Sequence, residues 1–349
     1  MQSTNTIDQW LMNNSFDVSD FSNYTELYLL KIKKKLTISV IIPTLEEEKT
    51  IGNILNILIS KLILEVPLID EIMVVDGGSN DSTISICEGF SEHVKLVHEK
   101  NILPNADTSK GKGNQLWKGL YICNSDIVVY MDSDLKNFNE RFVIGIVGPL
   151  LKTDIKFIKG FYERKLSSSQ TVTNNGGRVT ELCARPLLNM VYPELSGFIQ
   201  PLGGEYGGYT NVLKKIHYSS GYGVEVKLLI EIFNNFGLDV MGQVNLYSKE
   251  HDHQPLNALS KMSYTIMKTI LNSKFYDLNL NNNSLLIKNI TNNDNTNIKI
   301  RSEEHIQCNG KGRDMCNNYF KYCEINEKVL IPIEFINNLN NDNKYNLQL

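Results

Sequence analysis

The chain has 349 residues, of which 42% are apolar, 9% aromatic and 21% charged. These fractions are typical of a globular protein and exclude a disordered, collagen-like or coiled-coil chain. A formal charge of -4 argues against a protein that follows a nucleic-acid backbone, because that function needs clustered basic charge. The amino terminus is polar, and no apolar run reaches the ~18 residues of a membrane span. We therefore expect a cytoplasmic protein with no signal peptide, membrane span or nucleic-acid partner.

Apolar runs of strand length alternate with helix-like segments along much of the chain. The pattern predicts strands at 36–42, 71–75, 95–98, 127–131, 155–160 and 243–247. It predicts helical segments at 46–64, 113–123, 180–191, 225–236 and 256–271. Strands and helices that alternate at this spacing form βαβ units. The expected fold is therefore α/β, a Rossmann-like and mostly parallel sheet with helices on both faces.

Polar residues follow three of these predicted strands, at 43–48, 76–81 and 132–134. Open parallel sheets bind ligands beyond the carboxyl ends of their strands. We expect these three loops to form one binding site. After residue 160 the chain becomes rich in glycine, with clusters at 176–177, 203–208 and 221–223.

Asp132 and Asp134 are two residues apart at the end of a predicted buried strand, so their carboxylates point to one side. Hard oxygen ligands of this kind suit Mg²⁺ or Mn²⁺ that bridges a diphosphate. The alternative is a polar turn with two solvated acids. Lys112 lies between two glycines, which predicts close approach of an anion, although the segment lacks the P-loop pattern. The alternative there is a simple helix start.

Later residues offer further ligand contacts. Arg178 stands among glycines beside Thr180, a combination that suits an acidic ligand, or else is a surface arginine at a helix start. Glu225 begins a predicted helix, where it either accepts hydrogen bonds from sugar hydroxyls or favours the helix dipole. His251 and His253 follow the last predicted strand and could supply an imidazole ligand to a metal.

Taken in order, these motifs resemble those of the GT-A nucleotide-sugar glycosyltransferases and, within them, the retaining glucosyl-3-phosphoglycerate synthase family. The resemblance covers residues 10–271. It rests on the loops at 41–48, 74–81 and 132–134, and on Gly111-Lys112-Gly113, Lys159-Gly160-Phe161-Tyr162, Gly176-Gly177-Arg178-Val179-Thr180, Gln200-Pro201-Leu202-Gly203-Gly204-Glu205-Tyr206 and Gly221-Tyr222-Gly223-Val224-Glu225.

The resemblance implies a metal-dependent hexosyltransferase that moves glucose from UDP-glucose to the 2-hydroxyl of 3-phosphoglycerate with retention. It implies that Asp134, Arg178 and Glu225 are catalytic and that Asp134 and His251 hold Mg²⁺ or Mn²⁺. It assigns the acceptor to Gly177, Arg178, Thr180 and His253. It assigns the donor to Pro43, Thr44, Glu47, Ser79, Lys112, Asp132, Asp134, Leu202, Tyr222 and Glu225.

The sequence departs from the family pattern in two places. Asp252-His253 replace the usual Arg-Asn after the metal histidine, and Glu46 replaces the usual Asn of the first loop. The first departure puts the acceptor in question. The competing functions are the same fold with GDP-mannose or glycerate as a substrate, and a non-catalytic nucleotide-sugar-binding protein. A sugar-phosphate nucleotidyltransferase would instead need a glycine-rich, basic first loop.

The predicted organisation has four parts. They are a helical segment at 1–35, a nucleotide-sugar-binding α/β part at 36–160, an acceptor-binding part at 161–273 and an extension at 274–349. Nine of the 25 residues from Tyr276 to Ile300 are Asn, a residue that favours turns over helices. We expect the extension to be extended or weakly ordered. A homodimer is also expected, although no sequence motif specifies the oligomeric state.

Overall fold

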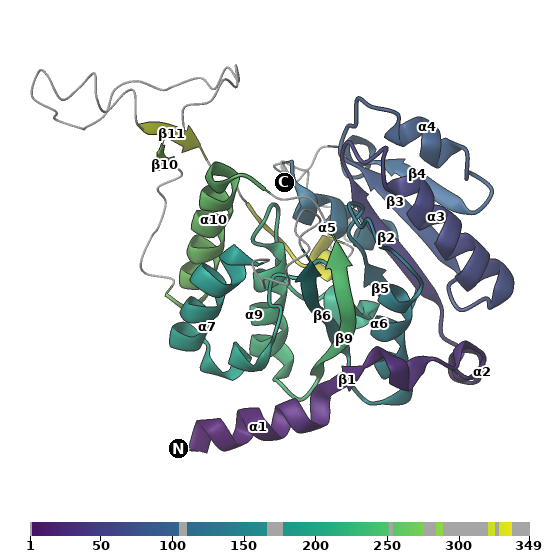
Figure 1. Cartoon of the computed structure of the whole chain (residues 1–349), viewed down its shortest axis with the longest axis horizontal. Coiled ribbons are helices and arrows are strands. Elements are labelled where there is room, and N and C mark those ends of the chain that lie inside the picture. Colours follow the sequence, from purple (N-terminus) through teal and green to yellow (C-terminus); the bar gives the residue numbers. More distant parts are fainter. Residues whose placement is uncertain are drawn as a thin grey trace, which may run out of the picture.

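The computed structural model describes residues 2–104, 110–165, 177–250, 254–275, 284–288, 320–324 and 328–336. Within these ranges eight strands form one sheet in the order β1-β9-β6-β7-β5-β2-β3-β4 (Figure 1). They are β1 (Ser15–Asp17), β2 (Ile38–Thr44), β3 (Glu71–Asp76), β4 (Val94–His98), β5 (Ile127–Tyr130), β6 (Phe157–Lys165), β7 (Tyr206–Tyr209) and β9 (Met241–Glu250). All neighbours pair in parallel except those of β7. The predicted mostly parallel sheet is confirmed.

No strand was predicted at the position of β7, which overlaps the glycine-rich cluster at 203–208. It pairs antiparallel with β5 on one side and with β6 on the other. A Cβ atom on Gly207 would lie 2.5 Å from the carbonyl oxygen of Val128, and one on Gly208 would lie 2.6 Å from that of Lys156. The two glycines therefore let β7 fit between its neighbours, which is why a loop-like composition forms a central strand.

Side chains of the parallel strands alternate between two apolar clusters. Ile42 and Val74 face a cluster that includes α2 (Tyr24–Lys34), α3 (Ile51–Ile59), α4 (Thr83–Glu88) and α6 (Arg141–Lys152). Ile41 and Val75 face the other, with α1 (Gln2–Asn14), α5 (Lys112–Ile122), α7 (Arg185–Val191), α9 (Val224–Phe236) and α10 (Leu256–Lys274). Successive residues of a strand point to opposite faces, so a fully apolar strand needs cover on both sides. Helices on both faces are confirmed.

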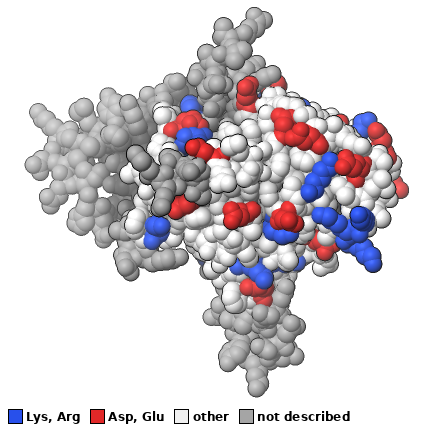
Figure 2. Space-filling model, turned by 90° about the horizontal axis from the view of Figure 1, so that it is seen from below, with Lys and Arg blue, Asp and Glu red and all other residues white. Residues whose placement is uncertain are grey.

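The remaining described elements are short. They are η1 (Val18–Phe21), η2 (Ser60–Glu65), η3 (Glu99–Asn101), η4 (Thr180–Ala184), η5 (Pro193–Gly197), α8 (Thr210–Leu213), β8 (Tyr218–Ser219), β10 (Ser284–Lys288), β11 (Phe320–Glu324) and β12 (Val329–Leu330). No helix in the described ranges is long and apolar enough to cross a membrane. Figure 2 shows basic and acidic side chains interspersed over the described part of one face.

Several predicted element boundaries differ by a few residues from those observed. Strand β6, for example, was predicted at 155–160 and spans Phe157–Lys165. The first helix was predicted from residue 46 but begins at Ile51, because Glu46 has a φ of 59° and a left-handed residue cannot start a helix. The last strand was predicted to end at Tyr247 but continues to Glu250. The four-part division of the chain stays a prediction. The predicted parts at 1–35, 36–160 and 161–273 all contribute strands to the same sheet.

Residues 328–336 correct the expectation of a weakly ordered extension. Strand β12 pairs antiparallel with β8, and the indole Nε1 of Trp117 donates a 2.8 Å hydrogen bond to the carbonyl oxygen of Ile331. Leu330, Ile333 and Ile336 are buried in the cluster that covers α5 and α9. This short apolar segment contributes to the core. It was not predicted, because the expectation for the extension was based on its high Asn content. Most of the preceding extension lies outside the described residues.

Substituting Ile333 with Ala should lower the free energy of unfolding by about 2–5 kcal/mol, because the change leaves a cavity in the core. Urea denaturation followed by circular dichroism measures the effect. The matched control is Val329→Ala in the same segment, since Val329 is 62% exposed and its truncation should cost under about 1 kcal/mol. Equal effects of the two substitutions would show that residues 328–336 do not pack as described.

Candidate active site

The three polar loops predicted to form one site do meet at one edge of the sheet. The amide of Gln115 on α5 donates hydrogen bonds to the carbonyl oxygens of Thr44 at 2.9 Å and Val75 at 3.0 Å. The hydroxyl of Ser133 donates a 2.8 Å bond to the carbonyl oxygen of Pro43. These bonds join the ends of β2, β3 and β5 directly, so the loops share one position in space.

The first two loops form a compact polar wall. The Glu46 N–H donates a 2.9 Å hydrogen bond to the Ser79 hydroxyl, and the Glu47 N–H donates a 2.8 Å bond to the hydroxyl of Thr83. Asp76 is buried and accepts bonds from the N–H groups of Gly78 and Ser79. Burial favours the neutral acid, but these bonds lower the pKa of Asp76 overall. The wall therefore presents an ionised, ordered turn at the position predicted for the uridine.

Asp132 is held between two lysines. Its Oδ1 atom lies 2.5 Å from Nζ of Lys112, and its Oδ2 atom lies 2.6 Å from Nζ of Lys249. Burial raises the pKa of the carboxyl, but the two ammonium groups outweigh it and bring the pKa well below its usual value. A Cβ atom on Gly204 would lie 2.1 Å from Oδ2, so only glycine allows this carboxylate position. Asp132 is thus a carboxylate whose two oxygens are both engaged.

Asp134 has the opposite character. Its Oδ1 atom is buried and has no hydrogen-bond partner among the described residues. The nearby Glu47 has a pKa raised to about 7, first by burial and then by the negative charge of Asp134. A cation beside Asp134 would satisfy the unpartnered oxygen and offset this accumulated negative charge. The residues present therefore fit a divalent metal, with Asp134 as the ligand of the pair.

The rest of the predicted metal site is not described. His251 and His253 lie outside the described residues. Within the described ranges, no three His, Cys, Asp or Glu side chains converge as a preformed metal site. The sequence-based assignment of His251 as the second ligand stays a prediction.

Lys112 links the loop that contains Asp132 and Asp134 to Glu225, which is predicted to contact the sugar. Its Nζ atom also lies 2.7 Å from Oε1 of Glu225, whose side chain is 7% exposed in the first turn of α9. Burial opposes the charged amine, but Asp132 and Glu225 raise the pKa of Lys112 above its usual value. The ammonium is therefore fixed between one carboxylate on the diphosphate side and one on the sugar side.

The glycines around Lys112 have a packing role. A Cβ atom on Gly113 would lie 1.8 Å from the carbonyl oxygen of Ser219, and Gly111 has a φ of +152°. The Asn114 N–H donates a 2.8 Å bond to the carbonyl oxygen of Ser220. The start of α5 therefore rests on the backbone that leads into the loop of Tyr222, which is 57% exposed at the site predicted for the glucose.

The predicted acceptor residues lie on a separate segment. Gly177 has a φ of +82°, Thr180 is buried, and Arg178 is exposed at its start. The guanidinium Nη2 of Arg178 donates a 3.1 Å hydrogen bond to the carbonyl oxygen of Gln254. Arg178 therefore reaches the chain immediately after His253, which the resemblance assigns to the acceptor.

Sequence reasoning missed two buried charges of the site. Lys249 is 4% exposed, and Nζ lies 2.6 Å from Oε1 of the fully buried Glu205. The signal was present, because Lys249 precedes His251 by two residues and would share its side of an extended strand. It was overlooked because the strand was ended at Tyr247. That residue has a φ of 68°, next to a register shift between β9 and β6, after which pairing resumes.

The comparisons with known proteins agree with this architecture. Residues 39–168 match a family model described as glycosyl transferase family 2. The glucosyl-3-phosphoglycerate synthase of Petrotoga mobilis is 45% identical over 275 residues, which are 78% of this chain and 84% of that protein.

Two solved structures are also similar. One is glucosyl-3-phosphoglycerate synthase from Mycobacterium tuberculosis in complex with Mn²⁺, UDP-glucose and phosphoglyceric acid. It is 40% identical, with a TM-score of 0.64 over 72% of this chain and 83% of that one. The other is mannosyl-3-phosphoglycerate synthase from Rubrobacter xylanophilus, which is 28% identical with a TM-score of 0.79 over 94% of this chain and 99% of that one. The predicted glycosyltransferase fold is confirmed.

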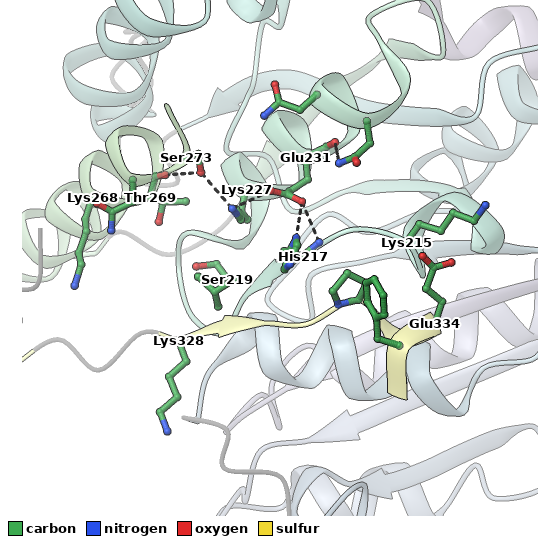
Figure 3. Close-up of a pocket in the computed structure, with 16 residues that line it drawn as sticks. Lys215, His217, Ser219, Lys227, Glu231, Lys268, Thr269, Ser273, Lys328 and Glu334 are labelled. Carbon is green, nitrogen blue, oxygen red and sulfur yellow. Dashed lines mark hydrogen bonds and ion pairs between the residues drawn. The ribbon is translucent and has the colours of Figure 1, made fainter. Parts of the chain in front are cut away.

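A cavity of about 690 Å³ lies apart from these loops, between β8, α9, α10 and residues 328–336. Figure 3 shows His217 and Lys227 both reaching Glu231 in its wall, at 2.9 and 3.0 Å. Burial raises the pKa of Glu231, but these two partners outweigh it and lower the pKa to about 2. The cavity contains none of the predicted site residues. These contacts of Glu231 tie α9 to the segment before β8.

Glu231→Gln should lower the free energy of unfolding by roughly 3 kcal/mol at pH 7, because a pKa lowered from 4.5 to about 2 represents that much stabilisation of the ionised form. This stabilisation is fully present above pH 4.5 and is lost as the pH falls toward 2. The difference from wild type should therefore shrink to less than half by about pH 3. Urea titrations at several pH values measure it.

The matched control for this network is Glu334→Gln in the same cavity. Among the described residues Glu334 makes no ion pair, so this substitution should give a small difference. A pH-independent loss for Glu231→Gln would contradict the electrostatic explanation.

Proposed function

We propose that this chain, which belongs to the glucosyl-3-phosphoglycerate synthase family, transfers glucose from UDP-glucose to the 2-hydroxyl of 3-phosphoglycerate with retention. The observation that carries the proposal is that the two aspartates of the D-x-D motif differ in their partners. Asp132 is neutralised by Lys112 and Lys249, while Asp134 keeps a buried oxygen without a partner. This is the donor set expected for a metal-bound diphosphate, in a chain 45% identical to a glucosyl-3-phosphoglycerate synthase.

On the donor side, the chain's own residues supply shape and fixed charge. The loops that contain Pro43, Thr44, Glu47 and Ser79 would hold the uridine, because they form one ordered wall at the carboxyl ends of β2 and β3. Lys112 would face the diphosphate, where a preorganised ammonium stabilises the charge that develops on the leaving group. Asp134, with His251 as the second proposed ligand, would hold the divalent metal. When bound, such a metal acts as a Lewis acid on the leaving diphosphate.

On the sugar side, Glu225 would accept hydrogen bonds from glucose hydroxyls, with Leu202 and Tyr222 as the other walls. Two of the site's carboxylates are engaged by lysines, Asp132 by two and Glu225 by one. Neither is therefore positioned as the free nucleophile that a double-displacement mechanism requires. This arrangement supports attack from the face that the UDP leaves, with a phosphate oxygen of the leaving group taking the acceptor proton.

For the acceptor, Gly177, Arg178 and Thr180 would bind the carboxylate and phosphate of 3-phosphoglycerate. A guanidinium binds such anions through two parallel hydrogen bonds. The bond from Arg178 to the Gln254 carbonyl places it next to His253, the proposed substitute for the usual Asn contact. Glycerate, which lacks the phosphate, would leave part of this cationic site unused.

The competing donor is GDP-mannose, because a mannosyl-3-phosphoglycerate synthase shares the fold over nearly the whole chain. UDP-glucose is favoured because that neighbour is 28% identical, against 45% for the Petrotoga mobilis enzyme. The test is product formation by the purified protein with each of UDP-glucose and GDP-mannose, each of 3-phosphoglycerate and glycerate, and each of Mg²⁺ and Mn²⁺. Faster turnover of GDP-mannose than of UDP-glucose would overturn the donor assignment. No release of UDP in any combination would favour a non-catalytic binding protein.

We also infer a cytoplasmic location and a homodimer. The soluble sugar-nucleotide substrate supports the first, and the family resemblance supports the second. Multi-angle light scattering after size-exclusion chromatography measures the number of chains in the particle.

Asp134→Ala should lower kcat/KM by roughly 100-fold or more, because it removes the proposed metal ligand at the leaving group. The fold should persist, since this carboxylate makes no described hydrogen bond that holds the core. Calorimetric titration with Mn²⁺ in the presence of UDP should show weaker metal binding. The control is Asp239→Ala at the opposite end of β9. Retention of more than about a tenth of wild-type activity in metal-replete buffer would contradict the assignment.

Arg178→Lys should raise the KM for 3-phosphoglycerate by about 10- to 150-fold, the cost of one charge-assisted hydrogen bond, while leaving UDP-glucose affinity nearly unchanged. Steady-state kinetics and calorimetry measure the two effects. Arg185→Lys is a matched control on the same segment, because Arg185 pairs with Glu181 and is not assigned to the acceptor. Loss of donor affinity with unaltered acceptor saturation would instead place Arg178 at the diphosphate.

A further inference from the structure

Lys159 is a buried lysine that the proposed mechanism does not use. It lies on β6, is 1% exposed, and its Nζ atom is 4.3 Å from the centroid of the Tyr206 ring. The ammonium donates a hydrogen bond to the carbonyl oxygen of Gly203. Burying a lysine is costly unless its charge is matched, so its retention in the core calls for a specific role.

The carbonyl that Lys159 holds belongs to the glucose side of the site. Gly203 follows Leu202, the residue proposed to line the sugar, and precedes Gly204, which packs against the Asp132 carboxylate. The Gly160 N–H donates a 2.8 Å bond to the carbonyl oxygen of Glu205. Two consecutive residues of β6 therefore fix the 202–205 segment through its carbonyl groups.

The charges that face Lys159 come from several elements around the site. Burial lowers the pKa of Lys159 to about 7. The strongest opposing influence is the negative charge of Glu225 on α9, and Lys112 on α5 adds repulsion. Glu205 and Asp132 contribute further attraction. The ammonium thus lies within electrostatic reach of both the sugar-side carboxylate and the lysine that faces the diphosphate.

We propose that Lys159 is a positioning residue for the sugar of the donor: its bond to the Gly203 carbonyl fixes the Leu202 wall of the glucose pocket from inside the sheet. This inference rests on the proposed function, because it assumes that a sugar lies between Leu202 and Glu225. It assigns Lys159 no contact with the nucleotide, whose wall is built from β2 and β3. The role therefore separates binding of the sugar from binding of the UDP.

The test compares the affinities for UDP and UDP-glucose, measured by calorimetry in Mn²⁺-containing buffer, together with kcat/KM for UDP-glucose. Lys159→Met removes the hydrogen bond but keeps the length of the side chain. It should leave the affinity for UDP within about twofold of wild type. Affinity for UDP-glucose relative to UDP, and kcat/KM, should fall about 10- to 100-fold, the range expected for loss of a bond to a charged group.

Two further variants guard against misfolding of the Met variant. Lys159→Gln cannot reach the carbonyl and should show the same selective loss, whereas Lys159→Arg keeps a cationic donor and should restore part of the discrimination. The control is Lys31→Met. Lys31 is 3% exposed and pairs with Asp70 away from the site, so its loss should lower the melting temperature without changing the UDP to UDP-glucose ratio.

Equal weakening of UDP and UDP-glucose by Lys159→Met or Lys159→Gln would overturn the proposal, as would unchanged kcat/KM in either folded variant. A changed ratio in Lys31→Met would also overturn it, because the effect would then follow general destabilisation. Failure of the wild-type chain to use UDP-glucose is a different outcome. It would refute the proposed function itself, and it is recognised before any variant is compared.

Discussion

The double ion pair of Asp132 with Lys112 and Lys249 is the interaction on which the arrangement of the site depends. Removing three charges from water is expensive, and the cost is offset only when the geometry is close and the remaining valences are filled. The second partners, Glu225 at 2.7 Å from Lys112 and Glu205 at 2.6 Å from Lys249, offset part of this cost. The five residues come from the ends of β5 and β9, the starts of α5 and α9, and the residue before β7. Helices and strands far apart in sequence are thereby held at one point.

The same ion pairs give the two aspartates different environments and therefore different proposed roles. Because lysines occupy both oxygens of Asp132, that residue holds in place two cations, one of which, Lys112, is proposed to face the diphosphate. Asp134, whose buried Oδ1 atom has no hydrogen-bond partner among the described residues, is the proposed metal ligand. Gly204 allows the Asp132 carboxylate to lie between the two lysines, since a side chain at residue 204 would displace that carboxylate. The glycine-rich motifs of this chain therefore act as spacers that let backbone approach charged groups.

Much of this could be predicted from the sequence, because apolar strands, D-x-D spacing and turn residues are local signals. The sheet, the two covered faces and the meeting of three loops all follow from them. Strand β7 could not be recognised, since Gly207 and Gly208 are strand residues only in the gap between β5 and β6. Lys249 lay beyond an irregularity at Tyr247 that interrupts the alternation. The fit of β7 depends on tertiary contacts that no local pattern encodes, whereas Lys249 was missed because the predicted strand ended too early.

Glu46 and the 328–336 segment show how remote parts of the chain support the site. Glu46 takes a left-handed conformation that Asn adopts more readily, and the bond from its N–H to Ser79 holds it there. At the other end of the chain, β12 pairs with β8, and Ile331 accepts the bond from Trp117 on α5. Strand β8 leads directly into the backbone that supports Gly111 and Gly113. Since Lys112 lies between those glycines, the placement of its ammonium depends on a segment more than two hundred residues later in the chain.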